Sequence, residues 1–278
     1  MVVRLKALKG AATAAVTAFV LLAVNAPAAV AKSCSNDGTG FSSWLEGFKA
    51  KAASQGMSQS TINSTLGGIS YDRNVIRLDR NQKSFKLSFD QFYARRVSPQ
   101  LISRGRQKMA QHRATLDRME KRFGVPAEIV VAIWGLETNY GSDRGQGKSI
   151  VQSLATLTYD CRRSAFFEPQ LMAALRIVQN GDMSASQLRG GWAGEIGQTQ
   201  FLPLPYVKYA VDFDGNGHRD LINSVPDILA STANFLKAHG WAAGQDWHPG
   251  TKNYAVIGEW NAASVYQRTI SVMADKLR

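Results

Sequence analysis

Residues 125–141, VPAEIVVAIWGLETNYG, decide the fold prediction because they encode an apolar helix with an acidic group near its end. The proline in this stretch suits the first turn of a helix, where a missing N–H costs no hydrogen bond. Nearly every side chain that follows is apolar, so the helix is predicted to be buried. Glu137 follows Ile133 by four residues and Trp134 by three, and therefore shares their apolar face.

A carboxyl group on a buried face costs free energy unless it has a partner or a function. Desolvation beside Trp134 and the negative end of the helix dipole both favour the protonated form of Glu137. A carboxylic acid that stays protonated near neutral pH can act as a general acid on a glycosidic oxygen. The alternative is a solvated glutamate at a frayed helix end, and these two interpretations remain open on the residues alone.

The rest of the chain is mostly helical in its pattern. Apolar residues recur at helical spacing between capping and terminating residues, and strand signals are few and short. Residues 189–225 are rich in Gly, Pro, Asp and aromatic residues and are predicted to form a long functional loop. The predicted helices are 43–53, one following Ser58 up to Gly67, an amphipathic stretch from Pro99 to Gly124, 149–159, 164–180 and 226–239.

Residues 1–31 are typical of an export signal. A basic start precedes an apolar run, and Ala29-Val30-Ala31 is a small-residue cleavage site, so we expect cleavage after Ala31. The alternative is an uncleaved anchor, but the apolar run is short for a membrane span. Cleavage lowers the formal net charge from +12 to +9, because the segment carries three cations and no acid. A basic exported protein meets anionic surfaces such as the cell wall, and export disfavours a nucleic-acid partner.

Cys34 and Cys161 are the two cysteines, and both follow the predicted cleavage site. An even cysteine count in an oxidising compartment predicts one disulfide between them, with two free thiols as the alternative.

Several blocks of the sequence together resemble the lytic murein transglycosylase B family. The first is residues 125–141, and the others follow in the family's order over about residues 80–275: SLATLTYDCRR, GGWAGEIGQTQFLP, DFDGNGHRDL, ANFLKAHGW and EWNAASVYQRTI. The resemblance implies an α+β, mainly α, fold with a lysozyme-like core. The expected division is an N-terminal helical region at 32–120 and a catalytic domain at 121–278.

The resemblance also implies a reaction. Glu137 matches the family's catalytic acid, which protonates the oxygen between N-acetylmuramic acid and N-acetylglucosamine in peptidoglycan. It then takes the proton of the muramyl 6-hydroxyl as that oxygen attacks its own anomeric carbon. The product is a 1,6-anhydromuramyl end, formed without water or a cofactor. One carboxylate suffices for this chemistry, whereas most glycoside hydrolases use two.

The same blocks imply further substrate contacts. These are Tyr140, Gln200, Phe201 and Tyr266, together with the pair Arg162 and Arg163, which could bind carboxylates or sugar hydroxyls. The alternative for the two arginines is an ordinary surface pair. The alternative for the aromatic side chains is the core.

Two positions depart from the family's pattern. Glu195 stands in a loop where the family often has a small residue, and Gly191 stands where it often has a hydroxyl residue. Glu195 is a candidate base or substrate contact, but we favour a solvent-facing loop charge. The missing hydroxyl at Gly191 leaves the fine substrate preference open.

Residues 212–220, DFDGNGHRD, fit the spacing of a calcium-binding loop. The predicted ligands are the side chains of Asp212, Asp214, Asn216 and Asp220 and the backbone carbonyl of His218. The twelfth residue of the loop, counted from Asp212, is Asn223 rather than the Glu that usually binds Ca²⁺ through both oxygens. Asp227 is the residue that could substitute for it. The resemblance implies a single structural Ca²⁺; the alternative is an Asx-rich turn without metal.

The sequence therefore predicts a periplasmic lytic transglycosylase that acts on peptidoglycan strands and has no stable membrane anchor. One alternative is a hydrolytic muramidase that uses Glu137 and Glu195 with water. The other is a cell-wall-binding protein that has lost activity, which the presence of Glu137, Gln200 and the two arginines disfavours.

Overall fold

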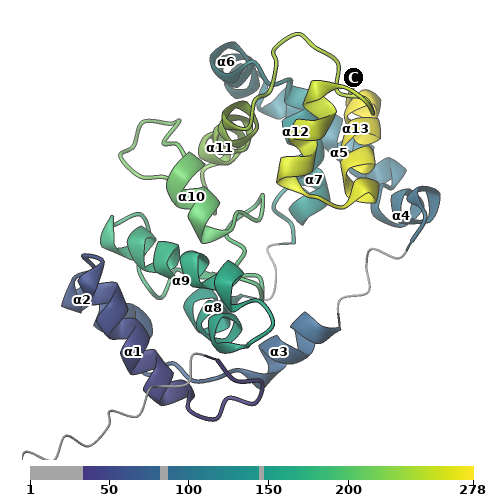
Figure 1. Cartoon of the computed structure of the whole chain (residues 1–278). Coiled ribbons are helices and arrows are strands. Elements are labelled where there is room, and N and C mark those ends of the chain that lie inside the picture. The colour runs from purple at the N-terminus through teal and green to yellow at the C-terminus, as the bar shows by residue number, and fades with distance from the viewer. Residues whose placement is uncertain (1–33, 82–86, 144–146) are drawn as a thin grey trace, which may run out of the picture. The chain divides into compact units, whose positions relative to one another are not determined.

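The computed structural model describes residues 34–81, 87–143 and 147–278 (Figure 1). The predicted signal peptide and its cleavage site lie outside these residues. The described helices are α1 (Phe41–Ser54), α2 (Gln59–Leu66), α3 (Arg73–Arg80), α4 (Phe89–Arg96), α5 (Pro99–Gln111), α6 (Arg113–Phe123), α7 (Ala127–Thr138), α8 (Ile150–Tyr159), α9 (Ser164–Gln179), α10 (Pro203–Tyr209), α11 (Val225–Ala238), α12 (Lys252–Trp260) and α13 (Ser264–Leu277). Among these residues, none of the helices is long and apolar enough to cross a membrane.

Helix α7 is the central helix of the fold. Ten of its twelve residues are buried, as the sequence predicts for its apolar composition. It packs against α5, α6, α11 and α13, which surround it in Figure 1. The helix ends where Asn139 and Tyr140 adopt positive φ angles of 50° and 61°. This sharp turn leaves Glu137 in the last turn of a helix that is otherwise enclosed.

The predicted N-terminal region, residues 32–120, does not pack as one group. Helices α1, α2 and α3 contact α8 and α9, whereas α4, α5 and α6 contact α7, α11 or α13. The described residues belong to one compact unit, and no unit boundary falls at residue 120. Each part of the N-terminal region instead completes a different side of the helical core.

Two predicted segments differ in the structure. The amphipathic stretch from Pro99 to Gly124 is interrupted at His112, which ends α5 and precedes α6. The predicted loop at 189–225 contains helix α10, which begins with Pro203 in its first turn and packs on α9. Proline at this position favours helix initiation, so a proline-rich segment was wrongly assigned to loop alone.

The remaining regular structure is one short antiparallel pair. Strand β1 (Lys148–Ser149) pairs with β2 (Arg189–Gly190), and this pairing anchors the start of the loop that follows β2. Just after the C-terminal end of α8, Cys161 forms the expected disulfide with Cys34, with Cα atoms 5.0 Å apart. The backbone N–H of Ser35 also donates to the carbonyl of Tyr159 at 2.9 Å. The first described residues are therefore fastened to the end of α8.

Candidate active site

Glu137 lies where two cavities meet. The larger, of about 580 Å³, is lined by residues of the 193–205 loop, α9 and α12, and we call it the aromatic cleft. The smaller, of about 310 Å³, is lined by α4, α5 and the end of α7. Among the residues that the structure describes, Glu137 alone lines both cavities. A carboxyl at such a junction can reach a ligand that extends across it.

Two side chains from distant helices donate hydrogen bonds to this carboxyl. Trp260 Nε1, at the end of α12, donates to Glu137 Oε1 at 3.0 Å. The hydroxyl of Tyr266, on α13, donates to the same oxygen at 2.8 Å. Because both donors use Oε1, the other oxygen, Oε2, is left to carry a proton or meet a ligand.

Burial raises the pKa of Glu137, and the hydrogen bonds from Trp260 and Tyr266 and the positive charge of Arg96 oppose that shift. Burial dominates because it disfavours the charged form over the whole group, while each neutral donor stabilises the carboxylate only partly. The negative charge of Glu195 adds to the rise in pKa. The site thus favours the protonated form of Glu137 and also supplies the hydrogen-bond donors that its conjugate base requires.

The loop after β2 is fixed against α7 by one glutamine. Gln198 accepts a hydrogen bond from Trp134 Nε1 at 2.9 Å, and its own amide donates to the Ile222 carbonyl at 2.8 Å. Its backbone carbonyl accepts from the Thr138 hydroxyl at 2.5 Å. The buried Gln198 therefore sets the distance between the loop and the helix that carries Glu137. Sequence analysis missed this role although Gln198 lies inside a quoted block.

Gln200 and Phe201, both predicted site residues, line the aromatic cleft. Gln200 has a positive φ of 55°, and its side-chain amide donates to the Gly197 carbonyl at 2.7 Å. Phe201 pairs with Ile196 across the turn and stacks edge-on against Trp260. The turn thus presents an amide and an aromatic ring to the cleft.

Glu195 also lines the aromatic cleft, so the expectation of a solvent-facing loop charge is wrong. Its Oε2 accepts the backbone N–H of Ala193 at 2.9 Å. Burial raises its pKa, which backbone hydrogen bonds and the charge of Arg163 partly oppose. A β-carbon placed on Gly191 would lie 2.1 Å from Glu195 Oε2, so the missing side chain at Gly191 provides the space for this carboxyl.

The predicted arginine pair is held mainly by a buried aspartate. Arg162 donates to Asp79 Oδ1 at 2.6 Å, and Arg163 donates to the same oxygen. Burial alone would raise the pKa of Asp79, but the hydrogen bonds from both arginines lower it overall. Arg80 joins Asp79 to Asp160 in the same network. Of the pair, Arg163 lines the aromatic cleft and Arg162 does not.

The two predicted tyrosines have different places. Tyr140 lies in the core, not in either cavity, and its hydroxyl donates to the Leu101 carbonyl at 2.9 Å. Its motif position reflects packing next to Gly135 rather than a surface for sugar stacking. Tyr266 is buried against Glu137, as described above, and is a positioning residue for that carboxyl. Trp260, the second donor, was missed although it stands in the block EWNAASVYQRTI.

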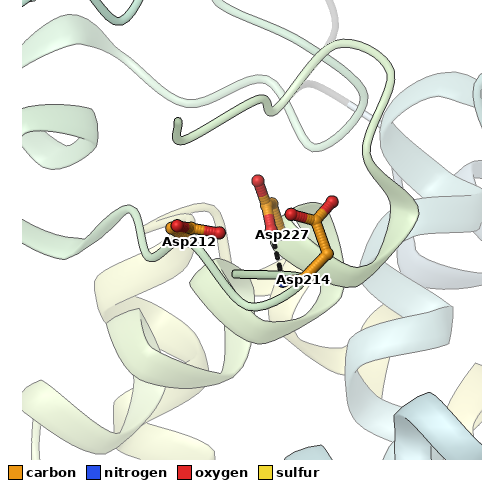
Figure 2. Close-up of side chains that lie close together, drawn as sticks. All are labelled: Asp212, Asp214 and Asp227. Atoms are coloured by element: carbon orange, nitrogen blue, oxygen red, sulfur yellow. Dashed lines mark hydrogen bonds between the residues drawn. The ribbon is translucent and has the colours of Figure 1, made fainter. Parts of the chain in front are cut away.

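In the predicted cation loop, the carboxylates that lie together are those of Asp212, Asp214 and Asp227. Their oxygens lie within 4.8 Å of one another, and Figure 2 shows the three side chains. The buried Asp227 accepts backbone N–H groups of Phe213 and Asp220 and so closes the loop from α11.

The side chains of Asp220 and Asn216 make hydrogen bonds within the loop. The Asp220 carboxylate accepts the N–H groups of Ile222 and Asn223, and Asn216 Oδ1 accepts that of His218. Asp227, which the sequence offered as a substitute for Asn223 at position 12, lies in the carboxylate cluster.

The helical fold, with a partly buried carboxyl group at the end of its central helix and beside an open cleft, defines a protein of the lysozyme-like class. The chain belongs to the transglycosylase SLT domain family, whose profile matches residues 40–252. A 149-residue segment is 38% identical to the membrane-bound lytic murein transglycosylase B of Escherichia coli K12. That segment is 53% of this chain and spans only 41% of that relative.

Solved structures agree with this assignment. SltB3 from Pseudomonas aeruginosa, in complex with NAG-anhNAM-pentapeptide, is 34% identical with a TM-score of 0.79. The match covers 85% of this chain and 79% of that one. The E. coli lytic transglycosylase Slt35, solved in complex with calcium, has a TM-score of 0.74 at 24% identity and covers 84% and 92% of the two chains. The latter likeness shows the fold alone.

Proposed function

We propose that this chain is a lytic transglycosylase, a carbon–oxygen lyase that cleaves the MurNAc–GlcNAc β-1,4 bond of peptidoglycan. The observation that carries the proposal is the carboxyl of Glu137, which is partly buried, has a raised pKa, and lines two cavities with two hydrogen-bond donors on one oxygen. Glu137 is the acid and then the base of the reaction.

In the first step, the proton on Glu137 Oε2 passes to the glycosidic oxygen as the bond from the muramyl anomeric carbon breaks. Trp260 and Tyr266 stabilise the carboxylate that forms, because their N–H and O–H groups already point at Oε1. In the second step, the carboxylate takes the proton of the muramyl 6-hydroxyl, and that oxygen bonds to the anomeric carbon. The proton returns to Glu137, no water enters, and the product is a 1,6-anhydromuramyl end.

Two relatives support the substrate and the product. The E. coli relative is a lytic murein transglycosylase, and SltB3 was solved with a NAG-anhNAM-pentapeptide bound. The anhydromuramyl group in that ligand is the group that the proposed reaction forms. The export signal predicted at residues 1–31 supports a periplasmic location, where peptidoglycan lies, and the basic net charge suits an anionic wall.

The test is to replace Glu137 with Gln and analyse the soluble products from purified peptidoglycan by mass spectrometry. Wild type should release anhydromuramyl ends. Glu137→Gln should lose at least about 10²–10⁴ in rate, since one residue serves both proton transfers. Binding to insoluble peptidoglycan should persist, because the shape of the side chain is retained. A rate within tenfold of wild type would remove Glu137 from the central role.

The second candidate is a hydrolytic muramidase, favoured by the position of Glu195 in the same cleft as Glu137. Two carboxyl groups, one protonated and one able to activate water, are the usual set for glycoside hydrolysis. Products discriminate between the candidates: hydrolysis gives reducing muramyl ends. Glu195→Gln should keep the anhydro product if the first proposal holds. Loss of activity together with reducing ends from wild type would favour the muramidase.

For the loop at 212–227 we propose a structural Ca²⁺ held by Asp212, Asp214 and Asp227. The cluster supplies only carboxylate oxygens, the ligands that Ca²⁺ prefers, and its three negative charges are not neutralised by an ion pair with a described residue. Ca²⁺ should stabilise metal-stripped protein by about 2.7 kcal/mol at one hundred times its dissociation constant. Asp212→Asn should remove this response and Asp117→Asn on α6 should not; equal melting curves of wild type with Ca²⁺ and with a chelator would exclude the site.

A further inference from the structure

The smaller cavity beside Glu137 is lined by three arginines. Arg95 and Arg96 end α4, and Arg104 lies on α5, facing the end of α7. Helices α4 and α5 both contact α13, and α5 contacts α7, so these segments lie side by side (Figure 1). The acidic residues that line the same cavity are Glu137 and Asp143. We call this cavity the arginine pocket.

These three arginines form no ion pair with a described carboxylate, whereas Arg163 in the aromatic cleft does. Arg96 donates to the Leu136 carbonyl, and Arg104 donates to the amide oxygen of Asn139 at 2.6 Å; both acceptors are neutral. Within the described residues, none of the three forms an ion pair with a carboxylate. In the aromatic cleft, by contrast, Arg163 forms an ion pair with the buried Asp79, which it shares with Arg162. The positive charge of the pocket is therefore available to a ligand.

Guanidinium groups bind carboxylates through paired N–H donors, and such charge-assisted bonds are stronger than neutral ones. Of the two sugars at the bond that we propose is cleaved, only the muramyl residue carries a substituent with carboxylates, its stem peptide. The arginine pocket adjoins the reacting carboxyl, so a group bound there lies within reach of that muramyl residue. The aromatic cleft, with its rings and the amide of Gln200, suits uncharged sugar rings instead.

We propose that the arginine pocket binds the carboxylates of the stem peptide, so that the enzyme selects peptide-bearing strands over strands stripped of their peptides. The proposal rests on the proposed function and extends it to substrate preference. Arg95 is the cleanest probe, because it is exposed and none of the hydrogen bonds given above involves it. Arg104 holds Asn139 at the end of α7, and Arg96 acts on the pKa of Glu137, so changes there also disturb the acid.

The experiment compares kcat and KM on two soluble, uncross-linked substrates: peptide-bearing strands and the same strands after an amidase has removed the peptides. The variants are Arg95→Gln and Arg104→Gln, with Lys121→Gln on α6 as a control that removes one exposed cation elsewhere. Each pocket variant should raise KM about tenfold on peptide-bearing strands, equivalent to about 1.4 kcal/mol. In Arg95→Gln the change in kcat should be smaller, since this binding is made before and during the reaction alike. Arg104→Gln should also lower kcat, because it releases Asn139 at the end of α7.

On stripped strands, KM should change by less than on peptide-bearing strands. The ratio of kcat/KM on peptide-bearing strands to kcat/KM on stripped strands should therefore fall in the pocket variants and not in Lys121→Gln. The KM of Arg95→Lys on peptide-bearing strands should lie between those of wild type and Arg95→Gln, because lysine keeps the positive charge but lacks the paired N–H donors of the guanidinium group. Equal losses of kcat/KM on both substrates overturn the proposal, because the arginines would then act only by stabilising the ends of their helices. A larger loss on stripped strands also overturns it, in favour of the lactyl carboxylate. Product identity tests the proposed function separately: reducing ends from wild type would refute that function while leaving the ratio measurable.

Discussion

Replacing Tyr266 with Phe tests whether the hydrogen bonds on Glu137 set its proton affinity. The substitution removes the hydroxyl that donates to Glu137 Oε1 at 2.8 Å and leaves Trp260 as the remaining donor. The ring itself is buried and packs edge-on against Phe92, so phenylalanine should keep the packing. The change therefore isolates one hydrogen bond to the acid.

The expected shift follows from the energy of that bond. A hydrogen bond to a charged group contributes about 1.5–3 kcal/mol, and one pKa unit corresponds to about 1.4 kcal/mol. Loss of the Tyr266 hydroxyl destabilises the carboxylate and should raise the pKa of Glu137 by about one to two units. The protonated acid then persists to higher pH, so the alkaline limb of the profile of kcat/KM against pH should move up by the same amount. The plateau should fall, because a weaker acid protonates the glycosidic oxygen less readily.

Tyr140→Phe is the matched control. It also removes a buried tyrosine hydroxyl, but one that donates to the Leu101 carbonyl rather than to the acid. Both variants should lose stability, by about 1–3 kcal/mol for an unsatisfied buried partner, and only Tyr266→Phe should shift the alkaline limb. An unshifted limb in Tyr266→Phe, or an equal shift in both variants, would refute the argument that this contact sets the pKa of Glu137.

Three further results are expected. Glu137→Gln should have a higher melting temperature than wild type near neutral pH, and this difference should shrink toward about pH 4. The reason is that a carboxyl whose pKa is raised in the folded state contributes less stability as pH rises above the ordinary glutamate pKa. A difference in melting temperature that stays constant with pH would contradict this. Gly191→Ala should destabilise wild type and have little effect in Glu195→Ala, giving a coupling of about 0.5–3 kcal/mol in denaturant unfolding, since its β-carbon would lie 2.1 Å from Glu195 Oε2; additive effects would disprove the clash. Denatured, unreduced protein should titrate without free thiols, and reduction of the bond between Cys34 and Cys161, 127 residues apart, should cost stability of about 4–5 kcal/mol in the chain-entropy account; two thiols per chain would exclude the bond.

The environment of Glu137 could be predicted from the sequence because it depends on helical spacing. Ile133 and Trp134 lie four and three residues before Glu137, and this local geometry fixes the shared apolar face. The donors to the carboxyl could not be predicted this way. Trp260 and Tyr266 are 123 and 129 residues distant in sequence, and only the packing of α12 and α13 brings them to Oε1.

Motif position alone gave the wrong role for residues whose hydrogen-bond partners are distant in the sequence. Tyr140 lies two residues after the end of α7, but its hydroxyl donates a hydrogen bond to the carbonyl of Leu101 on α5. Arg162 and Arg163 were assigned to the substrate, and the structure shows Asp79, more than eighty residues earlier, as their common acceptor. No local pattern marks Asp79 as buried, because its charge predicts exposure. The cost of burying it is offset only by arginines from another part of the chain.

The two departures from the family's pattern, considered separately in the sequence, are one change in the structure. The carboxyl of Glu195 occupies the volume that any side chain at 191 would need, so a hydroxyl residue at 191 and this position of Glu195 exclude each other. In this chain a carboxyl from position 195 therefore fills the space where the family's pattern often has a hydroxyl side chain from position 191. Burial raises the pKa of Glu195 and so favours its protonated form, which can donate a hydrogen bond as a hydroxyl does. Such a donor gives Glu195 a role in the cleft that needs no part in proton transfer at the proposed scissile bond.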